Sequence, residues 1–179
     1  MKLKTLFNTL FLLIVSVTIT LTSSISLHAQ SSRPKPLDMS FLNLIEGSWT
    51  GQSDMMGIKM NEQLVCRMDF NKQYLVINLT AASEDNAHTY SGMGVYGSDA
   101  DGNVKSWWFD EWGVGNVSMG SGKIDAMKMT LESASTNSTM NRTIELTGGN
   151  LVMKWTSTFK DNEGQMQTLS GETTYTKTK

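Results

Sequence analysis

The chain has 179 residues, with 15 Lys and Arg against 17 Asp and Glu, and a formal net charge of −2. This length suits one domain, and a mildly acidic balance without basic clusters argues against a nucleic-acid partner. The single cysteine, Cys66, excludes an internal disulfide framework.

The N-terminal segment has the order of an export signal. Lys2 and Lys4 precede an apolar run, and small and polar residues follow it up to Ala29. This order is typical of a secretory signal peptide, here residues 1–29, with Ser26 as an alternative cleavage position. A transmembrane anchor is the competing interpretation, but Thr and Ser residues shorten the apolar run below the roughly 20 residues that a span needs.

We therefore expect an exported protein, periplasmic or extracellular, without a membrane span after cleavage. Because the signal carries two lysines and no acid, the mature chain would have 13 basic and 17 acidic residues and a net charge of −4. Residues 30–36 contain both prolines and predict a polar linker. Residues 37–45 then place Leu37, Phe41, Leu44 and Ile45 at a helical spacing, with Ser40 as a candidate N-cap.

From residue 46 onward the apolar period changes to two. The clearest segment is 58–70, whose even positions are apolar except for Glu62 and whose odd positions are mostly polar. Clusters of Gly, Asn and Asp separate such segments. Together they predict ten strands, near 46–53, 58–70, 73–83, 88–97, 104–112, 116–121, 124–133, 138–147, 150–160 and 165–177.

No helical pattern of useful length lies between these segments, so a parallel sheet with crossover helices is disfavoured. Ten antiparallel strands with short connections lose their exposed edges by closing into a barrel. We therefore predict an all-β domain over residues 37–179, a single up-and-down antiparallel barrel with a short N-terminal helix. An open sandwich is the structural alternative. Since a barrel of this size leaves room for a small ligand, its interior is the expected functional region.

Two sets of motifs resemble known barrel families. Residues 42–51 form a hydrophobic helix followed by the pattern G-x-W-x-G, which is similar to the opening of the lipocalin and fatty-acid-binding superfamily. In that superfamily the helix plugs one barrel end and the Trp packs beneath the first strand. The ordered segments 92–96 (GMGVY), 99–102 (DADG) and 107–110 (WWFD) further resemble a family of small secreted bacterial lipocalin-like barrels of unknown function, near the heme-binding nitrobindins.

The resemblance covers roughly residues 37–179 and implies a ten-stranded barrel with an internal pocket, but no established reaction. The resemblance to nitrobindins implies a heme held by a histidine near the end of the barrel. After the predicted signal peptide the chain has one histidine, His88, and residues 165–179 have none. We therefore expect no heme and predict no cofactor. No zinc-ligand spacing or phosphate loop occurs, so no metal site is predicted.

Side chains at every second position of a strand share one face, and this parity of position selects the candidate pocket residues. Glu62 and Arg142 share parity with apolar neighbours, and an inward charge is costly unless it is paired. Either the two pair across the lumen, or Arg142 holds a ligand carboxylate through its guanidinium fork, or it reaches solvent at a strand end. Methionines suit an adaptable apolar pocket as well as an ordinary core. Alternation puts Trp107 and Phe109 on one face and Trp108 on the other. The candidate ligand-binding residues are Met60, Glu62, Met68, Tyr90, Trp107, Phe109, Arg142, Met153 and Trp155.

Three functions remain open. The first is an exported binding protein, a monomer or weak dimer, holding a small apolar or amphipathic molecule. The second is an enzyme of the same fold acting on a lipid-like or cyclic substrate, with Glu62, Tyr90 or His88 as acid or base, although no nucleophile elbow supports it. The third is a structural module whose lumen is filled by Met and Trp. A cavity would separate the third from the other two.

Overall fold

The computed structural model of the protein describes residues 37, 39–161 and 163–178, and the predicted signal peptide and linker lie outside them. This part of the chain contains an α-helix, a 3-10 turn and ten strands. Their bounds are α2 Met39–Ile45, β1 Gly47–Met55, β2 Ile58–Asp69, β3 Tyr74–Ser83, β4 Thr89–Ser98, β5 Val104–Asp110, η1 Val114–Asn116, β6 Ser118–Asp125, β7 Lys128–Ala134, β8 Ser138–Thr147, β9 Asn150–Lys160 and β10 Met166–Lys177.

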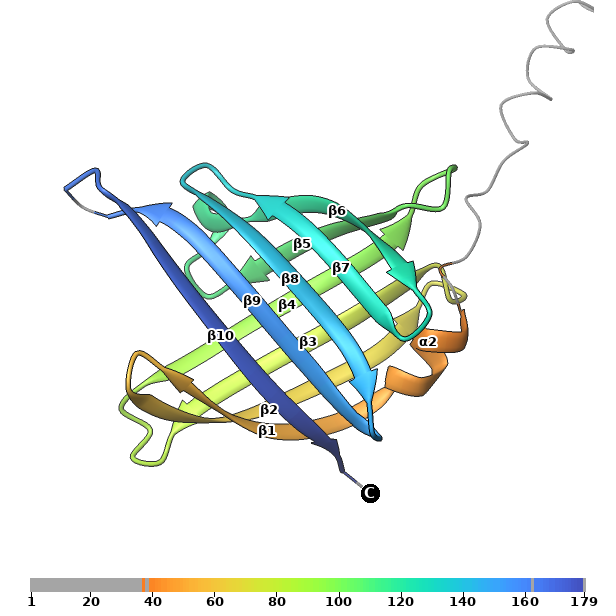
Figure 1. Ribbon diagram of the computed structural model, residues 1–179, viewed down its shortest axis with the longest axis horizontal. Coiled ribbons are helices and arrows are strands. Elements are labelled where there is room, and N and C mark those ends of the chain that lie inside the picture. Colours follow the sequence, from red (N-terminus) through yellow and green to blue (C-terminus); the bar gives the residue numbers. More distant parts are fainter. Residues whose placement is uncertain (1–36, 38, 162, 179) are drawn as a thin grey trace, which may run out of the picture. The chain divides into compact units, whose positions relative to one another are not determined.

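The strands form a closed antiparallel barrel in which each pairs with its neighbours in sequence and β1 pairs with β10 (Figure 1). The predicted fold class is thus confirmed. The largest difference concerns β6, predicted at 116–121. Gly120 and Gly122 resemble a turn signal, yet both lie inside β6, where an added Cβ would collide with the backbone of β7. Glycine therefore marks close strand packing here instead of a chain reversal.

Helix α2 closes one end of the barrel, which we call the helix end. Phe41, Leu42 and Ile45 are fully buried, whereas Leu44, one of the predicted apolar positions, is 44% exposed. The buried three pack into a cluster with inward side chains of several strands, including Trp49. Burial of each contributes about 1.5–3 kcal/mol. Because a helix of only seven residues is not stable alone, this packing holds it in place.

Trp49 explains the G-x-W-x-G pattern. Its indole Nε1 donates a 2.8 Å hydrogen bond to the carbonyl oxygen of Ile45, one of the helix's terminal carbonyls, which have no partner inside the helix. Lys177 of β10 donates to the Leu44 carbonyl oxygen at 3.3 Å, and its ammonium lies 5.2 Å from the Trp49 ring centroid. The two ends of the barrel wall therefore join at the helix end.

The junction between β1 and β10, which we call the seam, has the shortest strand pairing in the barrel relative to the lengths of its two strands. Its pairing runs from Trp49–Lys177 to Gln52–Thr174 only, although β10 begins at Met166. Residues 166–173 of β10 pair with β9 alone, and residues 53–55 of β1 pair with β2 alone. The two strands diverge away from the helix end (Figure 1).

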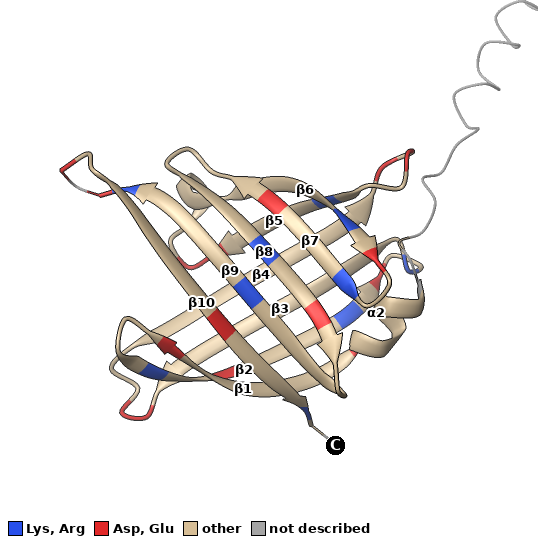
Figure 2. Cartoon of the chain, viewed as in Figure 1, with Lys and Arg blue, Asp and Glu red and all other residues tan. Residues whose placement is uncertain are grey.

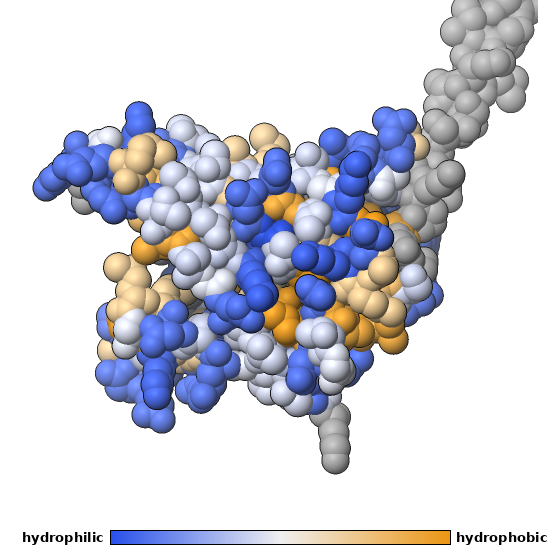
Figure 3. Space-filling model, in the orientation of Figure 1, coloured by the Kyte–Doolittle hydropathy of each residue, from blue (hydrophilic) through white to orange (hydrophobic). Residues whose placement is uncertain are grey.

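The outer wall carries charges of both signs. Lys154 of β9 and Glu172 of β10 form a 3.1 Å ion pair, and Figure 2 shows this basic and acidic pair of positions on the two neighbouring strands. Figure 3 shows hydrophilic and neutral side chains over most of the same face, with a notch between the β9–β10 and β1–β2 hairpins. Among the described residues, no helix has the length and apolar character needed to cross a membrane.

Candidate ligand-binding cavity

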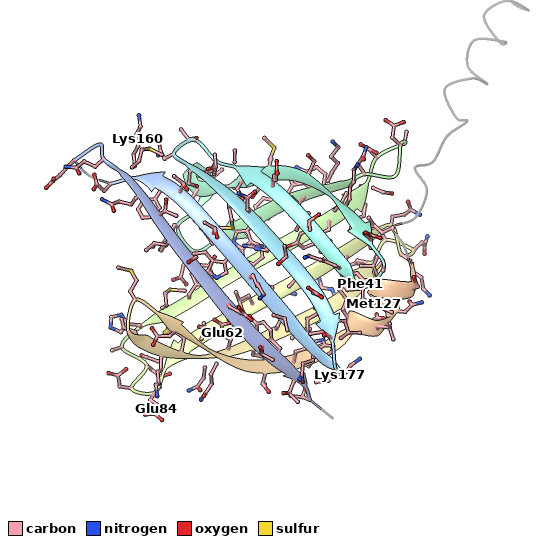
Figure 4. All side chains as sticks on the ribbon, viewed as in Figure 1. Phe41, Glu62, Glu84, Met127, Lys160 and Lys177 are labelled. Atoms are coloured by element: carbon pink, nitrogen blue, oxygen red, sulfur yellow. The ribbon has the colours of Figure 1, made fainter. Side chains whose placement is uncertain are left out.

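A cavity of about 590 Å³ lies in the part of the barrel remote from α2. Its lining reaches the hairpins opposite the helix, with Met55, His88, Trp112, Asn137 and Lys160 among the lining residues. We call this the open end; in Figure 4, Glu84 and Lys160 lie there, and Phe41 and Lys177 lie at the helix end. The volume falls in the range of small-molecule sites. The lumen is therefore not filled, which removes the basis for the third function considered from sequence.

Six of the nine candidate residues line this cavity: Met60, Glu62, Tyr90, Arg142, Met153 and Trp155. They come from β2, β4, β8 and β9. Sequence reasoning left out several others that line it, among them Trp108, Met140 and Tyr175.

Trp107 and Phe109 do not line the cavity, and here the choice of face was wrong. Trp108 faces inward and is 7% exposed, whereas Phe109 is 38% exposed. The ring of Trp108 lies against Gly92 of β4, where an added Cβ would approach it to 2.6 Å. Gly94, the residue of β4 that pairs with Trp108 in the ladder, also lacks a side chain. Gly92 therefore provides the space that the inward ring of Trp108 occupies.

Met68 is the third candidate outside the cavity. It packs against the buried cluster at the helix end. Among the residues of β2 that line the cavity, Glu62 comes nearest to Met68 in sequence, and it is six positions away. The even position of Met68 on β2 correctly gives an inward direction. However, parity says which face a side chain occupies and nothing about its depth along the barrel.

Glu62 forms one polar centre of the cavity wall. It is 7% exposed, and its carboxylate accepts hydrogen bonds from Ser53 Oγ at 2.5 Å and from the Tyr175 hydroxyl. Tyr175 lies on β10 and reaches Glu62 across Gly51 of β1. An added Cβ at Gly51 would lie 3.0 Å from the Tyr175 ring and 2.8 Å from the Thr174 carbonyl oxygen, so a side chain there would obstruct the contact.

Tyr175 is held in its neutral form. Burial and the negative charge of Glu62 raise the pKa of its hydroxyl far above the usual value, and a hydrogen bond from Thr173 opposes this only in part. The hydroxyl thus donates its hydrogen to Glu62, and Ser53 donates to the same carboxylate. These groups form a preorganised network that holds the carboxylate in place.

Arg142 forms the second polar centre, on β8. Its guanidinium carbon lies 4.1 Å from the Trp108 ring centroid, and its nitrogens donate to the Tyr96 hydroxyl at 3.3 Å and to Met140 Sδ at 3.2 Å. Nε is buried and has no hydrogen-bond partner among the described residues. A guanidinium carries five N–H donors. The cation is therefore stacked and oriented, but it has only weak acceptors.

The two interior charges do not pair with each other. The ion pairs found in the described part of the chain join Arg67 to Asp69, Lys105 to Asp99, Lys128 to Glu145 and Lys154 to Glu172, all at the surface. The suggestion of a Glu62–Arg142 pair across the lumen is therefore wrong. Tyr175 and Ser53 occupy the carboxylate instead, and β2 and β8 lie four strand positions apart around the barrel.

The groups considered for acid–base chemistry do not converge. Tyr90 accepts a 3.0 Å hydrogen bond from Trp108 Nε1, and burial raises the pKa of its hydroxyl. His88 is exposed at the β3–β4 hairpin, where its backbone N–H donates to Ser83 Oγ at 3.0 Å. Within the described residues, neither is hydrogen bonded to Glu62. In the described part of the chain, these three groups therefore form no pair of nucleophile and base.

Cys66 is buried in the cluster at the helix end, and burial raises the pKa of its thiol to about 12. It is therefore an apolar packing residue without thiolate character at neutral pH. Searching the described residues finds no group of three His, Cys, Asp or Glu side chains that could hold a metal ion. The inward residues of β10 are Leu169, Gly171, Thr173 and Tyr175, none of them a histidine, and the absence of heme stays a prediction.

Comparison with known proteins shows the fold and not a family. No protein-family model matches the chain, and no curated protein sequence matches it significantly. The solved structure of Rv2717c from M. tuberculosis aligns with 80% of this chain and 99% of its own, at a TM-score of 0.58 and 13% identity. Zebrafish ileal bile acid-binding protein in complex with cholic acid aligns with 75% of this chain and 99% of its own, at a TM-score of 0.35 and 16% identity. At 13% identity the likeness to Rv2717c concerns the fold alone, and the fold of this chain is a ten-stranded, closed antiparallel barrel.

Proposed function

We propose that this protein is an exported binding protein that holds a small amphipathic molecule in the barrel cavity, with the molecule's anionic group at Arg142. The observation that carries the proposal is the state of Arg142, an interior cation whose buried Nε has no partner within the described residues. A charge in such a place is costly unless an opposite charge meets it. A carboxylate or similar anion would supply that charge through two parallel hydrogen bonds.

The rest of the cavity supports an apolar body for this molecule. Met60, Met153, Trp155 and Leu79 contribute to the wall. Methionine and tryptophan provide large contact areas, and the flexible thioethers adapt to an irregular ligand. The stacking of Arg142 on Trp108 holds the guanidinium plane in one orientation before any ligand arrives. Preorganisation of this kind lowers the entropy lost on binding.

Calorimetric titration with two ligands of equal chain length tests the proposal. Dodecanoic acid carries the anion, and dodecanol lacks it. We expect the acid to bind about 10- to 100-fold more tightly than the alcohol, because charge-assisted hydrogen bonds contribute about 1.5–3 kcal/mol. Arg142→Met should abolish that preference while keeping much of the length and apolar volume of the side chain. Equal affinities for acid and alcohol in the unmodified protein would refute the role of Arg142.

Arg67→Met is the matched control. Arg67 also lies on a strand, β2, but its side chain points outward, is 53% exposed and pairs with Asp69. This variant removes the same charge from the protein without touching the cavity. Its preference for the acid should equal that of the unmodified protein. A loss in both variants would show that net charge, and not the interior guanidinium, determines the preference.

Export is the other half of the proposal, and it is supported by the order of charged, apolar and small residues in 1–29. Fractionation of the producing cells, followed by N-terminal sequencing of the product, tests it directly. We expect the mature chain outside the cytoplasm and beginning at Gln30. A product that begins at Leu27 would support export with the alternative cleavage position. Recovery of the unprocessed chain, still beginning at Met1, in the cytoplasmic fraction alone would refute export.

A further inference from the structure

Glu62 gives the cavity a second polar centre, opposite in kind to Arg142. Both side chains line the same cavity, on strands four positions apart in a ring of ten, and therefore on nearly opposite walls. They do not pair with each other, since the ion pairs of the described residues all lie elsewhere. A molecule that satisfied Arg142 alone would leave its other end against a buried carboxylate.

The carboxylate of Glu62 retains free acceptor capacity. An ionised carboxyl group offers about four lone-pair positions, and two are used, one by Ser53 and one by Tyr175. The Tyr175 hydroxyl does not turn toward a ligand as a donor, because its one hydrogen is donated to Glu62. This wall of the cavity is thus rich in acceptors, and the group that complements it is a hydrogen-bond donor.

We propose that the molecule held in the cavity is bifunctional, with an anionic group at Arg142 and a hydrogen-bond donor, a hydroxyl or an ammonium, at Glu62. This inference rests on the proposed function and narrows its ligand class. The apolar side chains of Met60, Met153 and Trp155 line the cavity along with these two centres and suit a hydrocarbon body between the two polar groups. A simple fatty acid fits half of the site.

Three ligands that differ only at the far end test the inference: dodecanoic acid, ω-hydroxydodecanoic acid and ω-aminododecanoic acid, each with shorter and longer homologues. In a purely apolar cavity the plain acid binds best, because a terminal polar group is costly to desolvate. Here the order should reverse. A hydrogen bond to a charged acceptor predicts roughly 10- to 100-fold tighter binding of the hydroxy or the amino acid at the best chain length. The stronger of the two identifies the donor.

Glu62→Gln assigns the effect to this residue, since it keeps the shape of the side chain and removes its charge. We expect the preference for a terminal donor over the plain acid to fall at least about fivefold in this variant. Thermal unfolding of each variant shows that the barrel is intact. Where Glu62→Gln does not fold, Ser53→Ala serves in its place: it frees one more lone pair of Glu62 and should strengthen the preference.

The outcomes separate the two proposals. If all three acids bind equally, or the plain acid binds best, while Arg142→Met weakens them all, the bifunctional ligand is refuted and the proposed function stands. If none of the acids binds, or binding does not depend on Arg142, both are refuted. A donor preference that Glu62→Gln leaves unchanged also overturns the inference, because the donor would then be recognised elsewhere.

Discussion

Removal of the Tyr175 hydroxyl should destabilise the barrel, although it changes one atom. In Tyr175→Phe the Glu62 carboxylate loses one of its two donors. Glu62 is 7% exposed and Tyr175 is 1% exposed, so water has poor access to the vacated position. Loss of a hydrogen bond to a buried charged group costs about 1.5–3 kcal/mol. For a domain of this size, that corresponds to a fall in Tm of about 4–10 °C.

Urea and thermal denaturation followed by circular dichroism provide the measurement. Tyr74→Phe is the matched control, since it deletes the same atom from a tyrosine that is 37% exposed and whose hydroxyl forms no hydrogen bond within the described residues. We expect this control to change the free energy of unfolding by less than about 0.5 kcal/mol. If Tyr175→Phe is no less stable than Tyr74→Phe, the assigned hydrogen bond does not stabilise the native state and the account of the Glu62 centre fails.

Three further predictions concern the wall and the helix end. Gly51→Ala should cost about 1–3 kcal/mol by forcing Tyr175 aside, whereas Gly115→Ala, which adds a methyl group to open space, should be nearly neutral in the same unfolding assay. Trp49→Phe should cost about 1 kcal/mol through loss of the bond to the Ile45 carbonyl oxygen, and faster hydrogen exchange in α2 would confirm it. Cys66 should resist thiol reagents at pH 8 until the protein is unfolded. Burial raises the pKa of the Cys66 thiol from 9.0 to about 12 in the folded protein, so its contribution to stability is complete below pH 9 and is lost progressively as the pH rises toward 12. The free energy of unfolding of Cys66→Ala should therefore fall less steeply above pH 9 than that of the unmodified protein. Parallel curves for the two proteins would contradict this.

The alternation of residue types was enough to predict the barrel and most inward positions. On β2 apolar and polar residues alternate cleanly, so the inward direction of Met60 and Glu62 followed from parity. Strand β5 carries large aromatic residues on both faces, and the pattern there is ambiguous. The better signal lay on the neighbouring strand β4, where Gly92 and Gly94 share one face. Large inward rings fill the space that they leave, Trp108 at Gly92 and Tyr96 at Gly94.

The polar contacts of the cavity depend on distances that a sequence pattern does not contain. Tyr175 and Glu62 are 113 residues apart, and they meet because β1 and β10 close the barrel and Gly51 lies between them. Arg142 reaches Trp108 across the lumen for a similar reason. Parity can assign each of these residues to the interior. Whether two interior charges pair depends on strand position around the ring and on depth, both of which arise only on closure.

The incomplete seam between β1 and β10 bears on how a molecule enters and leaves. Toward the open end, residues 53–55 of β1 and 166–173 of β10 diverge and share no ladder pairing, and Met55, Leu169 and Thr173 from the two strands line the cavity. Widening this part of the wall breaks no strand pairing, so its energetic barrier arises from side-chain contacts alone. A long molecule could thus pass sideways through the seam without threading end-on past the hairpins. Under the proposed function, exchange of ligand would be governed by the side chains at the seam, and affinity would be governed by Arg142 and Glu62 inside.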